Sequence, residues 1–168
     1  SAGTYYVWVK DKAGNKTNKV FSIAQSSFCQ NYYLENQGSI SLNPNADDNY
    51  DYWAYSWKNG SKIITAQGQT LKISFSVSRY NTCIGGYLNT YIRNASTGAR
   101  TYIGRTGTAR GCTQWWNNNG NEDLTSPKTY KLPKDYNNYY IDFYGGGVGY
   151  YSGTHNITWN ITDVSITC

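Results

Sequence analysis

The chain has 168 residues and a formal net charge of +5, and its composition is unusual, with 18 Tyr, 6 Trp and 17 Gly but no Met and one His. This length accommodates one domain of ordinary size plus an appendage. No apolar run approaches the ~20 residues of a membrane-spanning helix, and the modest charge does not favour nucleic acid as a partner. We therefore expect neither membrane insertion nor nucleic-acid binding.

The first 23 residues have the pattern of a β-hairpin. Residues 5–9 (YYVWV) are aromatic or β-branched, and residues 20–23 alternate apolar and polar side chains, as strands do. Gly14 and Asn15 lie between these segments and favour a turn, since both residue types accept a positive φ angle readily. Two strands alone are marginally stable in water. The hairpin is therefore expected to need a partner sheet, either upstream of it or in the body that follows.

The same segment, GTYYVWVKDKAGNKT, resembles the closing strands of the bacterial Ig-like repeats that occur in tandem on Gram-positive surface proteins. The resemblance implies that residues 1–24 are the end of such a repeat. It also implies that the chain is part of a longer surface protein, with Ig-like repeats covalently linked upstream. The residues that match the repeat pattern are Gly3, Thr4, Tyr5, Val7, Val9, Asp11, Ala13, Gly14 and Asn15.

Residues 28–168 are predicted to form an all-β body, a two-sheet antiparallel sandwich. Short segments of strand composition are separated by turn signals such as Asn59-Gly60, Gly85-Gly86 and Gly145-Gly146-Gly147. Segment 70–78 alternates apolar with polar residues, so one of its faces is expected in the core and the other in solvent. The expected strands are 29–34, 39–42, 51–58, 62–66, 70–78, 87–93, 100–104, 113–116, 129–132, 138–144 and 157–167.

Two late segments resemble strands of the jelly-roll carbohydrate-binding modules. The segment NITDVSIT (160–167) is similar to the last strand of these modules, and YYIDFYG (139–145) is similar to the strand before it. The resemblance implies a jelly-roll-like sandwich and a glycan-binding function. It carries over no sugar-contacting residue to a position of this sequence.

The four cysteines, Cys29, Cys83, Cys112 and Cys168, contain no C-x-x-C pair, which argues against a zinc ribbon or a redox motif. An even number in a β-rich chain indicates two disulfides in an oxidising compartment, with three possible pairings; the alternative is four buried free thiols. We favour Cys29–Cys168 with Cys83–Cys112, because Cys29 opens the first strand of the body and Cys168 ends the last one. Such a protein is expected at the bacterial cell surface or secreted.

The charge is distributed unevenly. No acidic residue occurs between Asp51 and Glu122. The simpler interpretation is a solvated basic face, and the alternative is a docking surface for an anionic partner. The basic residues of this interval are Lys58, Lys62, Lys72, Arg79, Arg93, Arg100, Arg105 and Arg110.

The segment NPNADDNYD supplies oxygen ligands at alternating positions, at Asn45, Asp47, Asn49 and Asp51. This rhythm suits Ca²⁺, a hard cation that takes six to eight oxygen ligands, although the segment lacks the glycine and the final glutamate that an EF-hand requires. The alternative is a turn rich in Asn and Asp that binds no metal.

The jelly-roll resemblance implies a second place for calcium. Modules of this kind often hold a structural calcium near their first and last strands, which here would involve Glu35 or Asp163. Ca²⁺ is therefore the candidate structural cofactor, and no other cofactor is expected.

Aromatic residues beside polar loops are the main functional signal. Sugar rings stack their C–H faces on Trp and Tyr, while amide and guanidinium groups bond the hydroxyls; the alternative is that most rings fill the core and the sheet faces. Two arginines precede the Trp pair and would favour an acidic sugar, because guanidinium binds carboxylate and sulfate bidentately. The expected ligand-binding residues are Trp115, Trp116, Asn118, Tyr150, Tyr151, Arg105 and Arg110.

Catalysis has little support in the sequence. His155 lies in a Gly- and Tyr-rich segment where we expect it to be solvated, and no serine sits in a nucleophile elbow. A glycoside hydrolase would need two of the candidate carboxylates, Glu35, Glu122, Asp123 and Asp142, to face each other across a cleft. We predict instead a non-catalytic extracellular binding module that recognises a glycan or a host surface glycoprotein, with acidic and mucin-type glycans as candidates. The alternative is a structural or protein-binding adhesin tip without a sugar site.

Overall fold

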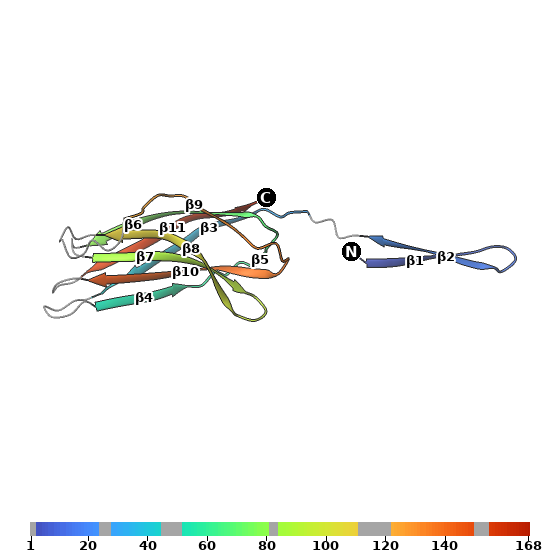
Figure 1. Cartoon of the computed structure of the whole chain (residues 1–168), viewed down its shortest axis with the longest axis horizontal. Helices are drawn as coiled ribbons and strands as arrows, with labels where there is room; N and C mark the ends of the chain where they lie inside the picture. The colour runs from blue at the N-terminus through green and yellow to red at the C-terminus, as the bar shows by residue number, and fades with distance from the viewer. Residues whose placement is uncertain (1–2, 24–27, 45–51, 81–83, 111–121, 150–154) are drawn as a thin grey trace.

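The computed structural model describes residues 3–23, 28–44, 52–80, 84–110, 122–149 and 155–168. All regular secondary structure within these ranges is β-strand, as the sequence predicts. Figure 1 shows two parts, an N-terminal β-hairpin and an elongated β-sandwich. Within the described ranges, the chain forms no helix long and apolar enough to cross a membrane.

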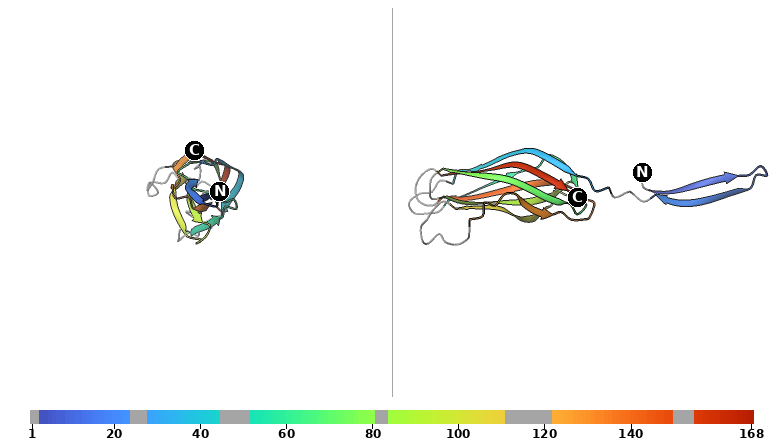
Figure 2. Two further views of the ribbon diagram at one scale, coloured as in Figure 1. Left: turned by 90° about the vertical axis from the view of Figure 1, so that its right-hand side faces the viewer. Right: turned by 90° about the horizontal axis from the view of Figure 1, so that it is seen from above.

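Two antiparallel sheets form the sandwich (Figures 1 and 2). The pairing of the strands within each sheet gives the strand order of a jelly roll. The short β5 (Ile64–Thr65) pairs with β10 and is left out of the following count. Among the other strands of the body, the first, the last, the third and the sixth form the first sheet, and the remaining four form the second sheet. The first sheet comprises β3 (Tyr32–Leu42), β11 (Asn156–Thr167), β6 (Thr70–Tyr80) and β9 (Lys128–Lys131). The second comprises β4 (Tyr52–Lys58), β10 (Asn138–Gly149), β7 (Ile84–Asn94) and β8 (Arg100–Arg110), with β5 paired to β10.

The core lies between the two sheets and is built from alternate residues of each strand. In β6, Leu71, Ile73 and Phe75 are buried and Lys72 is exposed, which confirms the two-faced strand predicted from the sequence. Trp159 of β11 is fully buried, with its ring centroid 6.0 Å from that of Phe75. Full burial of one large apolar side chain stabilises the fold by about 1.5–3 kcal/mol, so these alternating positions hold the sheets together.

The run of three glycines predicted to form a turn lies inside β10, so that prediction is wrong; Gly85 and Gly86 likewise lie inside β7. A β-carbon on Gly145 would lie 2.9 Å from Cγ2 of Ile40 on the facing sheet. A β-carbon on Gly146 would lie 2.5 Å from Cζ of Tyr87 on the outward side. The absence of a side chain at Gly145 therefore lets the two sheets approach closely. Its absence at Gly146 lets the ring of Tyr87 lie against the backbone of β10 on the outward side.

The N-terminal segment forms the predicted hairpin, in which β1 (Gly3–Lys10) pairs with β2 (Lys16–Ile23). Gly14 has a φ angle of 91° in the turn, and the backbone N–H of Asn15 donates to the Asp11 carboxylate at 2.9 Å. Within the described ranges, this two-stranded sheet pairs with no strand of the sandwich. Its resemblance to an Ig-like repeat stays a prediction.

A disulfide joins Cys29 to Cys168, with 5.8 Å between the two Cα atoms. It links the segment before β3 to the residue after β11, and Figure 1 places the C-terminus beside the chain that leads into β3. The backbone N–H of Cys168 also donates to Oδ1 of Asn31 at 3.0 Å. This bond is one of the two favoured pairings; Cys83 and Cys112 lie outside the described residues, so the second stays a prediction.

We predict that the Cys29→Ser, Cys168→Ser double variant loses about 4–5 kcal/mol of unfolding free energy, because the bond spans 139 residues and restricts the unfolded chain. Urea denaturation of wild type and variant, both without reductant, measures the difference. The Ser41→Ala variant, in which an exposed hydroxyl of β3 is removed, serves as control. A loss as small as that of the control would contradict the prediction.

Candidate functional site

Aromatic side chains cover the outward side of the second sheet. Every second residue of a strand points to this side, because side chains alternate across the strand. The register places Trp57 opposite Tyr144, and Tyr91 opposite Tyr102. We call this surface the aromatic face; its rings belong to Trp53, Tyr55, Trp57, Tyr87, Tyr91, Tyr102, Tyr140 and Tyr144.

Strand β4, at the edge of the sheet, contributes three exposed rings. Trp53, Tyr55 and Trp57 are 53%, 54% and 41% exposed, whereas Ala54 between them packs against the core. The ring planes of Trp53 and Tyr55 lie within 8° of each other, with centroids 6.0 Å apart. Adjacent exposed rings of this size form an apolar patch, and such patches mark interaction surfaces more often than isolated apolar residues do.

Tyr144 of β10 connects the rings of the aromatic face. Its centroid lies 5.9 Å from that of Tyr55 and 4.7 Å from that of Trp57. It also lies 6.2 Å from Tyr87 and 6.4 Å from Tyr91 on the neighbouring strand. All four distances fall in the range in which aromatic pairs attract each other. Burial raises the pKa of Tyr144, so its hydroxyl stays protonated at neutral pH and can donate a hydrogen bond.

Arg105 of β8 adds charge and hydrogen-bond donors to the aromatic face. Its guanidinium carbon lies 4.7 Å from the ring centroid of Tyr87, within the range of a cation–π contact. Its Nε donates to Oδ1 of the buried Asn89 at 3.2 Å, which fixes the orientation of both side chains. Burial raises the pKa of Tyr87 more than the charge of Arg105 lowers it. A ligand on this face would therefore meet rings, a guanidinium and protonated phenols together.

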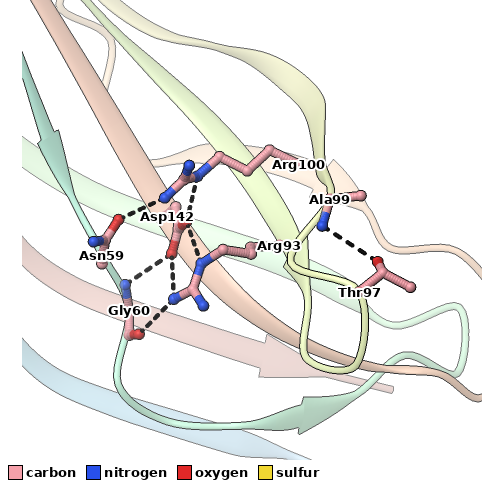
Figure 3. Close-up of polar contacts among 7 residues, drawn as sticks. All are labelled: Asn59, Gly60, Arg93, Thr97, Ala99, Arg100 and Asp142. Carbon is pink, nitrogen blue, oxygen red and sulfur yellow. Dashed lines mark hydrogen bonds and ion pairs between the residues drawn. The ribbon is translucent and has the colours of Figure 1, made fainter.

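Asp142 anchors a group of polar residues on the same face, which we call the Asp142 cluster (Figure 3). The carboxylate lies on the outward side of β10 but is fully buried, with Arg93, Arg100 and the Asn59-Gly60 segment after β4 around it. Its Oδ2 accepts from Nε of Arg93 at 2.8 Å and from Nε of Arg100 at 2.9 Å. Its Oδ1 accepts from the backbone N–H of Gly60 at 2.9 Å and from Nη2 of Arg93 at 3.3 Å. Nη2 of Arg100 donates to Oδ1 of Asn59 at 2.9 Å.

The Asp142 cluster carries a net positive charge. Burial alone would raise the pKa of Asp142, but the hydrogen bonds from Arg93, Gly60 and Arg100 outweigh burial and lower it. The carboxylate is therefore ionised at neutral pH, and the hydrogen bond to Asp142 raises the pKa of Arg93. Two guanidinium groups and one carboxylate leave one positive charge beside the rings.

Both arginines of the cluster also contact rings of the aromatic face. The guanidinium carbon of Arg100 lies 4.3 Å from the ring centroid of Trp57, and that of Arg93 lies 4.3 Å from the ring centroid of Tyr140. The Asp142 cluster and the aromatic face are therefore one continuous surface of rings and donors.

Two of the seven ligand-binding residues expected from the sequence lie within the described ranges, and their role stays a prediction. Arg105 lies on the aromatic face, and Arg110 is the last residue of β8. His155 is fully buried, so the expectation that it is solvated is wrong. The other expected ligand-binding residues lie outside the described residues: Trp115, Trp116, Asn118, Tyr150 and Tyr151.

Sequence reasoning did not select the rings of β4 or the Asp142 cluster as a site. The alternation in YWAYSWK was a usable signal, because it places Trp53, Tyr55 and Trp57 on one side of a strand. No comparable signal links Asp142 to Arg93 and Arg100, since the three residues lie on different strands and 42 to 49 positions separate the carboxylate from the arginines.

The second candidate calcium position lies on the first sheet. Glu35 of β3 is paired in register with Asp163 of β11, beside an irregularity in β11. Oδ1 of Asp163 is buried and has no hydrogen-bond partner among the described residues, and a hydrogen bond to Asp163 raises the pKa of Tyr33. Two carboxylates supply only part of the six to eight oxygens that Ca²⁺ takes, and no larger cluster of His, Cys, Asp or Glu occurs in the described ranges. The loop with Asn45, Asp47, Asn49 and Asp51 lies outside the described residues.

Comparison with known proteins identifies no family for this chain. No family model matches the sequence, and no curated protein matches it. Among solved structures, one similar chain comes from a study of the promiscuous specificity of carbohydrate-binding modules of the β-sandwich superfamily. It is 12% identical, the alignment covers 98% of this chain and 74% of that one, and the TM-score is 0.32.

We predict that Asp142→Asn lowers the unfolding free energy at pH 7 by about 3–5 kcal/mol, because it removes the charge that pairs with two partly buried guanidiniums. Since the folded pKa is lowered, this contribution is complete above the unfolded pKa of about 3.9 and disappears as the pH falls through the folded value. Urea denaturation at pH 7 and at about pH 3 measures both effects. Asp123→Asn, which removes a partly exposed pair with Lys128, serves as control with a much smaller expected loss. Equal losses in the two variants would refute the prediction.

We also predict that millimolar calcium raises the melting temperature relative to chelator, because a ligand that binds only the native state stabilises it. Asp163→Asn should remove the shift if the ion lies at Glu35 and Asp163, and Asp47→Asn should remove it if the ion lies at residues 45–51. Thermal melts of the three proteins distinguish the two positions. The absence of any shift in the wild type would count against both.

Proposed function

We propose that the chain is a non-catalytic extracellular module that binds glycans through the aromatic face. The observation that carries this proposal is the continuous set of exposed and half-buried rings that run from β4 across the sheet to β8, bordered by Arg105, Asn89 and the Asp142 cluster. A binding role explains why large rings remain in solvent on a sheet whose other side is a close-packed core.

The chemistry of the aromatic face suits a sugar. Pyranose rings present C–H groups that pack on aromatic faces, and their hydroxyls need donors and acceptors at the edge of the ring. The protonated hydroxyls of Tyr87 and Tyr144 can both donate and accept hydrogen bonds, and the guanidinium of Arg105 can donate them. Both kinds of contact are therefore available on a single sheet.

A binding role suits the Asp142 carboxylate better than a catalytic one. Its two oxygens accept four hydrogen bonds and its pKa is lowered, whereas the general acid of a glycosidase needs a raised pKa. Glu35 and Asp163 lie on the other sheet, away from the aromatic face. This arrangement supports recognition without hydrolysis.

The setting that we propose is the bacterial cell surface or the secreted fraction. The disulfide between Cys29 and Cys168 favours an oxidising compartment. We propose that upstream Ig-like repeats, to which the hairpin would belong, carry the module as a spacer. Acidic or mucin-type glycans of host glycoproteins are the candidate ligands, since the second sheet is rich in arginine.

A protein-binding adhesin tip is the second candidate. The hairpin favours it, because Tyr6, Trp8 and Val9 are 61%, 64% and 58% exposed in a two-stranded sheet. In that case the exposed rings would contact a protein surface, and no free oligosaccharide would compete for the site.

We predict that Trp53→Ala and Tyr55→Ala each weaken glycan binding by about tenfold, which corresponds to the ~1.4 kcal/mol expected for the loss of one stacking contact. A glycan array with the wild-type chain identifies the ligand, and calorimetric titration of the variants with that ligand measures the loss. The controls are matched in exposure: Trp8→Ala on the hairpin and Tyr33→Ala, 55% exposed, on the first sheet.

Unchanged affinity in Trp53→Ala and Tyr55→Ala, with binding lost instead in Trp115→Ala or Tyr150→Ala, would move the site from the aromatic face to the loops. Absence of glycan binding, together with tight binding to a host protein, would favour the adhesin alternative.

A further inference from the structure

The strands that form the aromatic face are strongly unbalanced in charge. β7 and β8 carry Arg93, Arg100, Arg105 and Arg110, and the one carboxylate of β4, β7, β8 and β10 is Asp142. That carboxylate is fully buried, so it presents no oxygen to a ligand on the surface. The charge that a ligand would meet on the described part of this face is therefore positive.

The Asp142 cluster holds more guanidinium donors than its acceptors use. A guanidinium has five N–H groups. In Arg100, Nε donates to Asp142 and Nη2 donates to Asn59. In Arg93, Nε donates to Asp142, and Nη2 donates to both Asp142 and the carbonyl of Gly60. In the described part of the chain, the Nη1 nitrogens of both arginines donate to no protein acceptor.

These donors are held in place and remain reachable. The side chains of Arg93 and Arg100 are 22% and 34% exposed, and each is fixed by its bonds to Asp142 on one side and by a ring beneath it on the other. A guanidinium fixed before binding loses little side-chain entropy when it meets an anion.

A purely structural role does not require both arginines. One guanidinium matches one carboxylate in charge and in geometry, and Arg93 alone contacts both oxygens of Asp142. Arg100 adds a second positive charge at the more exposed position, directly over the ring of Trp57. That charge is uncompensated by any other carboxylate of these four strands.

We propose that Arg100, supported by Arg93 and Asp142, binds the carboxylate or sulfate group of an acidic sugar whose ring packs on the aromatic face. The inference rests on the proposed glycan-binding function and names its ligand class, a uronate-containing or sulfated glycan. The anion completes the charge balance of the cluster, and the fork of Nη nitrogens receives its oxygens.

Matched ligand pairs test the inference. The first pair is a tetramer of galacturonic acid and its fully methyl-esterified form, which differ in charge but share a backbone. The second pair is a sulfated galactan oligosaccharide and its desulfated form. Calorimetric titration at low and high salt measures affinity, and the arginine Nε–Hε signals in nitrogen-15 spectra report directly on Arg93 and Arg100.

The wild type should bind the anionic member of at least one pair about tenfold more tightly than its neutral counterpart, and the preference should weaken with salt. Arg100→Gln should remove the preference for the anionic member over the neutral one. Arg100→Lys, which keeps the charge without the fork, should retain part of it. Arg79 of β6, on the first sheet, pairs with Glu122 and serves as the control. Arg79→Gln should leave the preference for the anionic ligand unchanged.

The outcomes separate the two proposals. Equal affinity for the charged and neutral members of both pairs would overturn the anion site and leave glycan binding standing. A preference that survives in a folded Arg100→Gln variant, checked by its melting curve, would also overturn the assignment to Arg100. Absence of binding to all four ligands would overturn the anion site, and glycan binding itself would be overturned only if the glycan array were negative as well.

Discussion

The two-residue period of β10 governs both the core and the candidate site. Ile141 and Phe143 point into the core, whereas Asp142 and Tyr144 point outward and organise the Asp142 cluster and the aromatic face. A slip of one residue would exchange the two sets and place a carboxylate in the apolar interior. Since β10 pairs with both β4 and β7, its register also aligns the rings of its neighbours. The packing of the core therefore positions the outward surface.

The Asp142 cluster illustrates how a buried charge can order a surface. A carboxylate removed from water is strongly unfavourable unless it is paired and hydrogen-bonded. Here Arg93, Arg100 and the backbone N–H of Gly60, which belong to three separate segments, all donate hydrogen bonds to this one carboxylate. The guanidiniums consequently lie against the rings of Trp57 and Tyr140 instead of extending into solvent. Charge and aromatic surface are combined because both arginines that bond this carboxylate also pack on rings.

Local patterns predicted most of the strands because they depend on near neighbours in the chain. The alternation in β6 and the turn residues of the hairpin were sufficient for both elements. The turns predicted at the glycine runs of β7 and β10 were wrong, since a residue without a side chain suits a turn and a close contact between sheets equally well. The glycines of β10 belong to the second case, which only the positions of Ile40 and Tyr87 reveal.

The sequence by itself predicted an all-β chain, an N-terminal hairpin and a sandwich with a favoured bond between its first and last cysteines. These features follow from composition, period and the placement of residues at strand ends. Only the tertiary structure decided that the rings of β4 face solvent, that Asp142 is buried by arginines, and that both lie on one sheet. A period of two shows which side chains share a face, but the pairing of strands distant in sequence decides which face meets the core.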